Sequence, residues 1–140
     1  WIRKDYVRVP DNFGSYKVFI SKANGSGAFG ETLSAPIIAE PGIGHTQTFM
    51  SIGKCESEQE AIAITKYIQT KFARAMLGVL KITQDCPAPK WKYVPLQDFT
   101  AHSDIDWSKS VAEIDRQLYR KYDLTADEIE FIETHVKEMA

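Results

Sequence analysis

The sequence predicts an α+β fold: a β-rich N-terminal half with a long central helix and a return strand, then a C-terminal helical hairpin. Three observations predict it. The stretch "YKVFIS" at 16–21 alternates and is rich in residues that favour strands. Residues 57–83 carry apolar side chains at helical spacing, and two shorter segments after residue 109 do the same.

The first half of the chain is predicted to contain three strands separated by turns. After 16–21, residues 24–36 are predicted to form a loop, because Asn, Gly, Ser and Pro dominate them. "PIIAE" is a short strand that "PGIG" stops. "TQTFMSIG", from Thr46, alternates again and is predicted to be the next strand.

A single long helix is predicted over "SEQEAIAITKYIQTKFARAMLGVLKIT". Ser57 and Glu60 have the spacing of a capping box. Ile64, Ile68 and Phe72 recur at the spacing of one helical face. The prolines of "QDCPAPK" end the helix, and the apolar "WKYVPL" is predicted to be an extended return strand.

The last forty residues predict two amphipathic helices, "SVAEIDRQLYRKY" and "LTADEIEFIETHVKEM". The second opens with a capping box of Thr125 and Glu128. We expect residues 1–99 to form an α+β recognition domain, and residues 100–140 to form an acidic helical tail packed on it or on a parent chain. The beginning "WIRKDYVRVP" lacks an initiator Met, so we expect a part of a longer protein.

Composition and charge restrict the class of protein. The chain has 140 residues, 44% hydrophobic and 26% charged, which suits one globular domain with a core. No apolar run has the ~20 residues of a membrane span, so we expect no membrane partner and a cytoplasmic location. Residues 1–100 hold 12 Lys or Arg and 9 Asp or Glu, whereas residues 101–140 hold 5 and 10. The mildly basic body is compatible with polyanion binding.

The residues predict no catalytic site and no metal site. Cys55 and Cys86 lack the spacing of a zinc site, and we expect both to be reduced, with a disulfide the less favoured alternative. Of the three histidines only His45, just before a predicted strand, lies in a notable place, and neither cysteine has a sequence context that marks it as activated. The paired carboxylates of "SDID" at 103–106 lack the spacing of a calcium loop.

The loop "KANGSGAFGE" at 22–31 contains the pattern G-x-G-x-x-G. A dinucleotide site needs these glycines to open a helix, but the following "ETLSAPII" contains a proline and no helical period. A kinase or P-loop reading fails because the companion motifs are absent from the sequence. We therefore expect a flexible surface loop whose bare backbone can approach another surface closely.

Polar side chains that read base edges or bind phosphates gather in the first half and around the central helix. The candidate DNA-binding residues are Lys17, Lys22, Asn24, Ser26, Thr32, His45, Thr46, Gln47, Thr48, Lys71, Arg74, Gln84, Lys90 and Lys92.

Three stretches carry a resemblance that covers about residues 10–139. They are "KVFISKANGSGAFGETLSAPIIAEPGIGHTQTFMSIG", "KYIQTKFARAMLGVLKITQDCPAPKWKYVPLQDF" and "SDIDWSKSVAEIDRQLYRKYDLTADEIEFIETHVKEM". Together they resemble the C-terminal part of bacterial type II restriction-modification enzymes with an adenine-specific DNA methyltransferase core, some fused to a restriction endonuclease or a helicase. The most specific stretch is "DRQLYRKYDLTADEIEFIE". The segment through "YVPLQDF" also resembles the recognition domains of type I specificity subunits.

The resemblance implies a target recognition domain that binds double-stranded DNA. In such enzymes the methyltransferase part binds S-adenosylmethionine and flips the target adenine. Neither its Asn/Asp-Pro-Pro-Tyr/Phe motif nor its cofactor motif has a counterpart here, so we expect no catalytic residue and no cofactor in this chain. The expected partners are duplex DNA and the rest of the parent methyltransferase. The alternative is a protein-interaction module that docks the parent enzyme's other domains or subunits.

Overall fold

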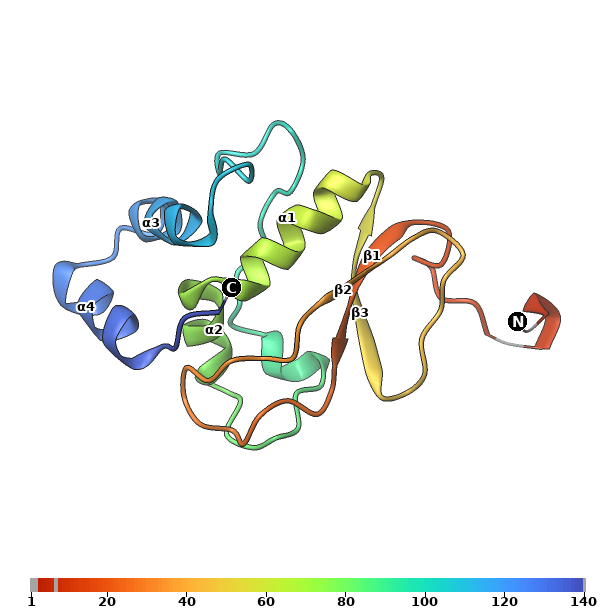
Figure 1. The fold of residues 1–140 in the computed structure, drawn as a ribbon, viewed down its shortest axis with the longest axis horizontal. Coiled ribbons are helices and arrows are strands. Elements are labelled where there is room, and N and C mark those ends of the chain that lie inside the picture. The colour runs from red at the N-terminus through yellow and green to blue at the C-terminus, as the bar shows by residue number, and fades with distance from the viewer. Residues whose placement is uncertain (1–2, 7, 140) are drawn as a thin grey trace.

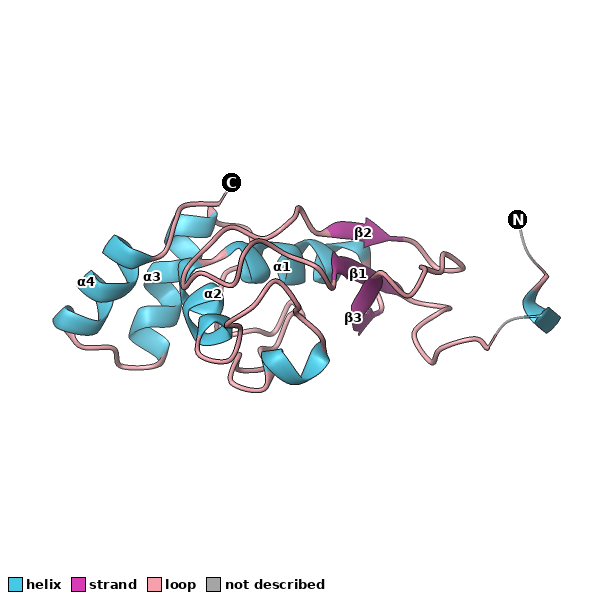
Figure 2. Ribbon diagram, turned by 90° about the horizontal axis from the view of Figure 1, so that it is seen from below, coloured by secondary structure: helices cyan, strands magenta, loops and turns pink. Residues whose placement is uncertain are grey.

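The computed structural model describes residues 3–6 and 8–139, and it has a mixed α/β architecture. A sheet of three antiparallel strands has the order β2-β1-β3, formed by Ile37–Ala39, Tyr16–Ser21 and Phe49–Cys55. The helices lie at the other end of the molecule, with α1 between them and the sheet (Figures 1 and 2). A short 3-10 helix, η1 at Lys4–Tyr6, precedes the sheet.

The three strands predicted for the first half are confirmed, with shifts in the boundaries of the second and third. β1 covers the predicted residues, and Val18 pairs with Ile38 on one side and Ile52 on the other. β3 begins at Phe49 rather than at Thr46, because Phe49 N–H donates to the Thr46 carbonyl in a turn.

The prediction of one long central helix is wrong, because the helix breaks at Thr70. α1 covers Glu58–Gln69 and α2 covers Lys71–Gly78. Thr70 has an extended ψ of 148°, and its hydroxyl donates to the Tyr67 carbonyl and accepts from the Ala73 amide. A threonine hydroxyl that caps the following turn competes with continuation of the helix. The apolar spacing continues across the break and does not reveal it.

The predicted return strand is also absent: residues 88–96 form a 3-10 helix and a turn. η2 covers Ala88–Trp91, and the Val94 amide donates to the Trp91 carbonyl. Prolines at 87, 89 and 95 restrict this segment and remove donors that a strand would need. Leu96, counted as part of an apolar strand, has 92% of its surface exposed.

Two helices complete the chain: α3 at Val111–Lys121 and α4 at Ala126–His135. Both begin with a full capping box, the predicted one at Thr125 and a second one formed by Ser110 and Glu113. The Tyr119 hydroxyl of α3 donates to Glu133 Oε1 of α4 at 2.8 Å. Within the described residues, no helix combines the length and the apolar character that crossing a membrane requires.

Two hydrophobic clusters support this arrangement. The first lies between the sheet and α1 and includes Val18, Ile20 and Ile64. The second joins α2 to the last two helices, through residues such as Phe72 and Leu118. This second cluster contains residues from both sides of position 99, so segment 100–140 packs on α1 and α2 of its own chain.

Candidate nucleic-acid interface

The glycine loop folds around a carboxylate of its own chain. Glu31 accepts hydrogen bonds from the backbone amides of Ser26 at 2.7 Å and Gly27 at 2.9 Å. The ammonium group of Lys81, which is only 3% exposed, forms an ion pair with the same carboxylate. Burial alone would raise the pKa of Glu31, but these hydrogen bonds and the Lys81 charge outweigh it and lower the pKa to about 2. The loop is therefore an anion-binding nest that already holds its anion.

The three glycines of this loop are needed for its conformation and its contacts. All three have positive φ, between 57° and 95°. A Cβ at Gly27 would lie 2.4 Å from the backbone nitrogen of Thr83, and one at Gly30 would lie 2.5 Å from the carbonyl oxygen of His135. The expectation of a flexible surface loop is wrong at these two positions, because their backbone packs on other parts of the same chain.

Asn24, a predicted base reader, is 2% exposed and serves the loop instead. Its amide nitrogen donates to the Ser21 carbonyl. Its carbonyl oxygen accepts from both the backbone amide and the hydroxyl of Ser34, each at 2.6 Å. These bonds place Asn24 inside the protein, so it does not belong to an exposed interface.

Lys17, predicted as a phosphate contact, is also inside, with 1% of its surface exposed. Its ammonium group donates to three backbone carbonyls, those of Phe13, Ser15 and Glu40, at 2.9 to 3.2 Å. Burial lowers the pKa of this ammonium group. The three carbonyls use all of its donors, so nothing remains for a phosphate.

Arg74, another predicted contact, is 3% exposed. Its guanidinium donates to the carbonyls of Glu31 at 3.3 Å and Lys137, and so joins the glycine loop to the C-terminal segment. Lys71 is half-buried, and its ammonium group pairs with the Glu133 carboxylate. Both cations bind their own chain rather than an exposed face.

The remaining candidates include a group that the fold brings together. The Lys22 amide donates to the Thr48 carbonyl at 2.9 Å, and the Lys22 carbonyl accepts from Cys86 at 2.7 Å. The Asn24 amide donates to the Gln84 carbonyl at 2.9 Å. Three segments distant in sequence thus lie side by side at one end of the sheet, near the start of β3 (Figure 1). We call this group the sheet-end cluster: Lys22, Thr46, Gln47, Thr48 and Gln84.

Side chains of the sheet-end cluster face solvent. Thr46, Gln47, Thr48 and Gln84 are exposed, and Lys22 is half-buried. Nearby, the His45 ring packs edge-on against the Phe19 ring, with 4.8 Å between the ring centroids. The Nδ1 atom of His45 lies 2.8 Å from the Thr46 carbonyl oxygen. The cluster offers hydroxyl, amide and ammonium groups, which are the types that contact phosphates and base edges.

Four other candidates are exposed or half-buried but do not belong to the segments whose backbone hydrogen bonds define the sheet-end cluster. Ser26 and Thr32 are exposed in the glycine loop. Lys90 is half-buried in η2, and exposed Lys92 lies over the Tyr93 ring at 5.7 Å.

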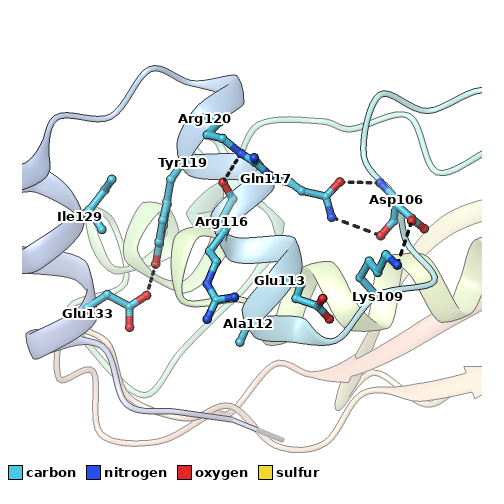
Figure 3. Close-up of a pocket in the computed structure, with 10 residues that line it drawn as sticks. All are labelled: Asp106, Lys109, Ala112, Glu113, Arg116, Gln117, Tyr119, Arg120, Ile129 and Glu133. Atoms are coloured by element: carbon cyan, nitrogen blue, oxygen red, sulfur yellow. Dashed lines mark hydrogen bonds and ion pairs between the residues drawn. The ribbon is translucent and has the colours of Figure 1, made fainter.

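Sequence reasoning missed a hollow beside α3, of about 910 Å³ (Figure 3). Its basic residues are Lys109, Arg116 and Arg120, and its acidic residues are Asp106, Glu113 and Glu133. Arg116 and Arg120, four positions apart, lie on one face of α3, and that spacing could have indicated them. The negative net charge of residues 101–140 hid the three basic residues that stand among the acidic ones in this hollow.

A buried carboxylate of α3, which does not line this hollow, holds the start of α2. Asp115, 3% exposed, accepts from the backbone amides of Lys71 at 3.0 Å and Phe72 at 2.9 Å. Burial raises the pKa of Asp115 to about 6, even though these two hydrogen bonds favour its charged form. Asp115 therefore satisfies amides that the break at Thr70 leaves without helical partners.

The described residues contain no group of three or more His, Cys, Asp or Glu that could hold a metal ion. Cys55 and Cys86 are buried free thiols, as expected. Burial raises the pKa of the Cys55 thiol to about 11, which does not favour a nucleophilic thiolate.

Comparison of the chain with protein-family models, curated proteins and solved structures found no match.

Proposed function

We propose that this chain is a target recognition domain, which reads double-stranded DNA for an adenine-specific methyltransferase of a restriction-modification system. The observation that carries the proposal is the sheet-end cluster. Segments around residues 22, 48 and 84 are joined by backbone hydrogen bonds and carry exposed polar side chains. Side chains fixed on neighbouring backbone segments can meet adjacent positions of one duplex.

The cluster divides into two kinds of contact. The ammonium group of Lys22 would bind a phosphate and set the register, because phosphate contacts position a protein without reading sequence. Gln47 and Gln84 would contact base edges, where an amide pairs well with adenine. Thr46 and Thr48, whose hydroxyl oxygens lie 2.7 Å apart, would serve either purpose.

Four sequence-predicted contacts leave the proposed set. Lys17, Asn24 and Arg74 bind carbonyls and hydroxyls of their own chain, and Lys71 pairs with the Glu133 carboxylate. Lys90 and Lys92 remain as secondary backbone contacts. S-adenosylmethionine and the chemical step belong to the methyltransferase part of the parent enzyme, and this chain contributes recognition.

Fluorescence anisotropy with a labelled mixed-sequence duplex tests the proposal. With about three phosphate contacts, the binding constant should fall roughly 40-fold between about 50 and 200 mM salt. Binding that does not depend on salt, or no binding at the lowest salt, would contradict the proposal.

Two substitutions assign the roles. Lys22→Ala should reduce the salt slope by about one unit and weaken all duplexes alike. Lys54→Ala is the matched control, since Lys54 is exposed near the opposite end of β3 and should leave the slope unchanged. Gln47→Ala should relax preference at one base pair by about 1–3 kcal/mol. Equal effects of Lys22→Ala and Lys54→Ala would mean that binding is not centred on the cluster.

A further inference from the structure

An apolar hollow of about 540 Å³ lies between the glycine loop, α2 and α4. Four large side chains that line it are exposed: Val79 by 54%, Phe131 by 48%, Phe29 by 40% and Tyr122 by 38%. Met76 and Leu124 complete its apolar lining. Clusters of exposed apolar side chains of this kind mark interaction surfaces.

The charge around this hollow is negative. Asp127 and Glu128 line its edge, and among the described residues that line it none is basic. Exposed Asp123 and Glu130 lie next to lining residues in the sequence, and so do the cations Lys71 and Lys121. Both cations are paired with carboxylates outside the acidic group named above, Lys71 with Glu133 and Lys121 with Asp104, so the acidic groups at the hollow outnumber the basic ones. A ligand that matches the hollow therefore carries large apolar side chains and positive charge.

The chain itself contains such a segment, residues 3–9. It holds Arg3, Lys4 and Arg8 against the single acidic residue Asp5. Tyr6 is 74% exposed and Val9 is 43% exposed. The contacts of Arg3 lie within the segment, an ion pair to Asp5 at 2.9 Å and a position over the Tyr6 ring at 5.6 Å.

We propose that the apolar hollow binds residues 3–9 of a second copy of this chain. Residues 3–6 of the segment and α4 lie at opposite ends of the molecule's long axis in both views, so they cannot meet within one chain as folded (Figures 1 and 2). The contact is therefore head to tail. A contact between two different surfaces of identical chains extends into open chains unless a rotation closes it into a ring.

Sedimentation equilibrium from micromolar to millimolar concentration tests this. The unsubstituted chain should show an average molecular mass that rises with protein concentration and falls when salt is added. Phe131→Glu or Val79→Glu in the hollow should abolish association, and so should the double change Arg3→Glu, Arg8→Glu. Leu96→Glu is the matched control, because Leu96 is a more exposed apolar residue outside both surfaces. Circular dichroism melting establishes that each variant is folded.

A complementation experiment makes the test specific for head-to-tail binding. The Phe131→Glu chain keeps the segment, and the Arg3→Glu, Arg8→Glu chain keeps the hollow. Each should be monomeric alone, and the mixture should form a one-to-one dimer that does not grow further. Adding Asp127→Lys to the charge-reversed chain should restore its self-association.

Three results would overturn the proposal: a monomer at every concentration, association that persists after both hollow substitutions, or loss of association in Leu96→Glu. None of them concerns DNA binding, so this inference and the proposed function succeed or fail separately.

Discussion

Two glycine-containing loops of this chain, residues 22–32 and 40–48, have similar compositions but opposite structural roles. The first holds the Glu31 carboxylate and packs Gly30 against the C-terminal segment. In the second, residues 41–48 are all exposed, and a Cβ at Gly42 would meet nothing within 4 Å. Both loops were expected to contact DNA. The first contributes only its first residue, Lys22, to the sheet-end cluster, whereas the second contributes Thr46, Gln47 and Thr48.

The difference comes from what lies within reach of each loop. Backbone amides that point together bind an anion, and in the first loop a glutamate a few residues away supplies it. Buried Lys81 then balances the charge. In the second loop, the acidic Glu40 uses its backbone carbonyl to hold Lys17, and its side chain is exposed. A polar, glycine-rich sequence therefore indicates accessibility only when its polar groups have no internal partners.

The largest expected effect is the removal of the internal anion. Glu31→Gln should lower the free energy of unfolding by about 3–5 kcal/mol, because it leaves the Lys81 ammonium group buried without a counter-charge. Urea denaturation measures it. Glu40→Gln in the other loop is the matched control and should stay within about 0.5 kcal/mol of the parent. Equal effects would remove the distinction between the loops.

Glycine substitutions compare the packing of the two loops at similar backbone geometry. Gly30 and Gly42 have φ of 68° and 85°. Gly30→Ala should cost about 2–4 kcal/mol, because backbone strain adds to a clash with the His135 carbonyl. Gly42→Ala has only the strain and should cost about 1 kcal/mol. Thermal melting of both variants checks the order, and a larger loss for Gly42→Ala would contradict it.

Acid should weaken the first loop in a defined pH range. The pKa of Glu31 is lowered from 4.5 to about 2, so its stabilisation is complete above pH 4.5 and is lost toward pH 2. The contribution of Asp115 to stability changes with pH in the opposite direction. Its pKa is raised to about 6 in the folded state, so the folded state gains stability as the pH falls.

Asp115 is present in both the unsubstituted chain and Glu31→Gln. The difference between their free energies of unfolding therefore reports on Glu31 alone. That difference should shrink by about 2 kcal/mol between about pH 6 and pH 3. Urea midpoints at several pH values measure it, and a constant difference would mean that Glu31 does not titrate as stated.

The smallest expected effects come from two amide side chains, one with a structural role and one with a proposed role in DNA binding. Asn24→Ala should cost about 1–3 kcal/mol of stability, because it leaves buried partners of the loop unpaired. Gln47→Ala should change stability by less than about 0.5 kcal/mol. In duplex binding the order should reverse, with a change in base preference only for Gln47→Ala. A preference change caused by Asn24→Ala in a fully folded protein would return Asn24 to the interface.

Local patterns predicted a large part of this fold. Alternation located β1, helical spacing located the last two helices, and one capping box located the start of α4, since these signals arise from residues close in the sequence. The break at Thr70 could not be predicted in the same way. Threonine is tolerated within helices, and here it ends one because Asp115 binds the amides that follow.

The same distinction between features set by neighbouring residues and features set by distant residues applies to the candidate site. Exposure of residues 46–48 agrees with their polar sequence next to a turn. Burial of Lys17 depends on three carbonyls, one of them from Glu40, 23 positions away. Residue type identified chemistry that could bind a phosphate, but it could not show that the chain had already used that chemistry.

The cap that Asp115 provides also has a consequence for the order of events during synthesis. Lys71 and Phe72 emerge from the ribosome early, and the carboxylate that completes the start of their helix follows 44 residues after Lys71. Until then, α2 has two amides without that partner and lacks the apolar face that α3 covers. The central part of the chain should therefore reach its final protection from hydrogen exchange only after the C-terminal helices dock, so that both halves fold as one cooperative unit.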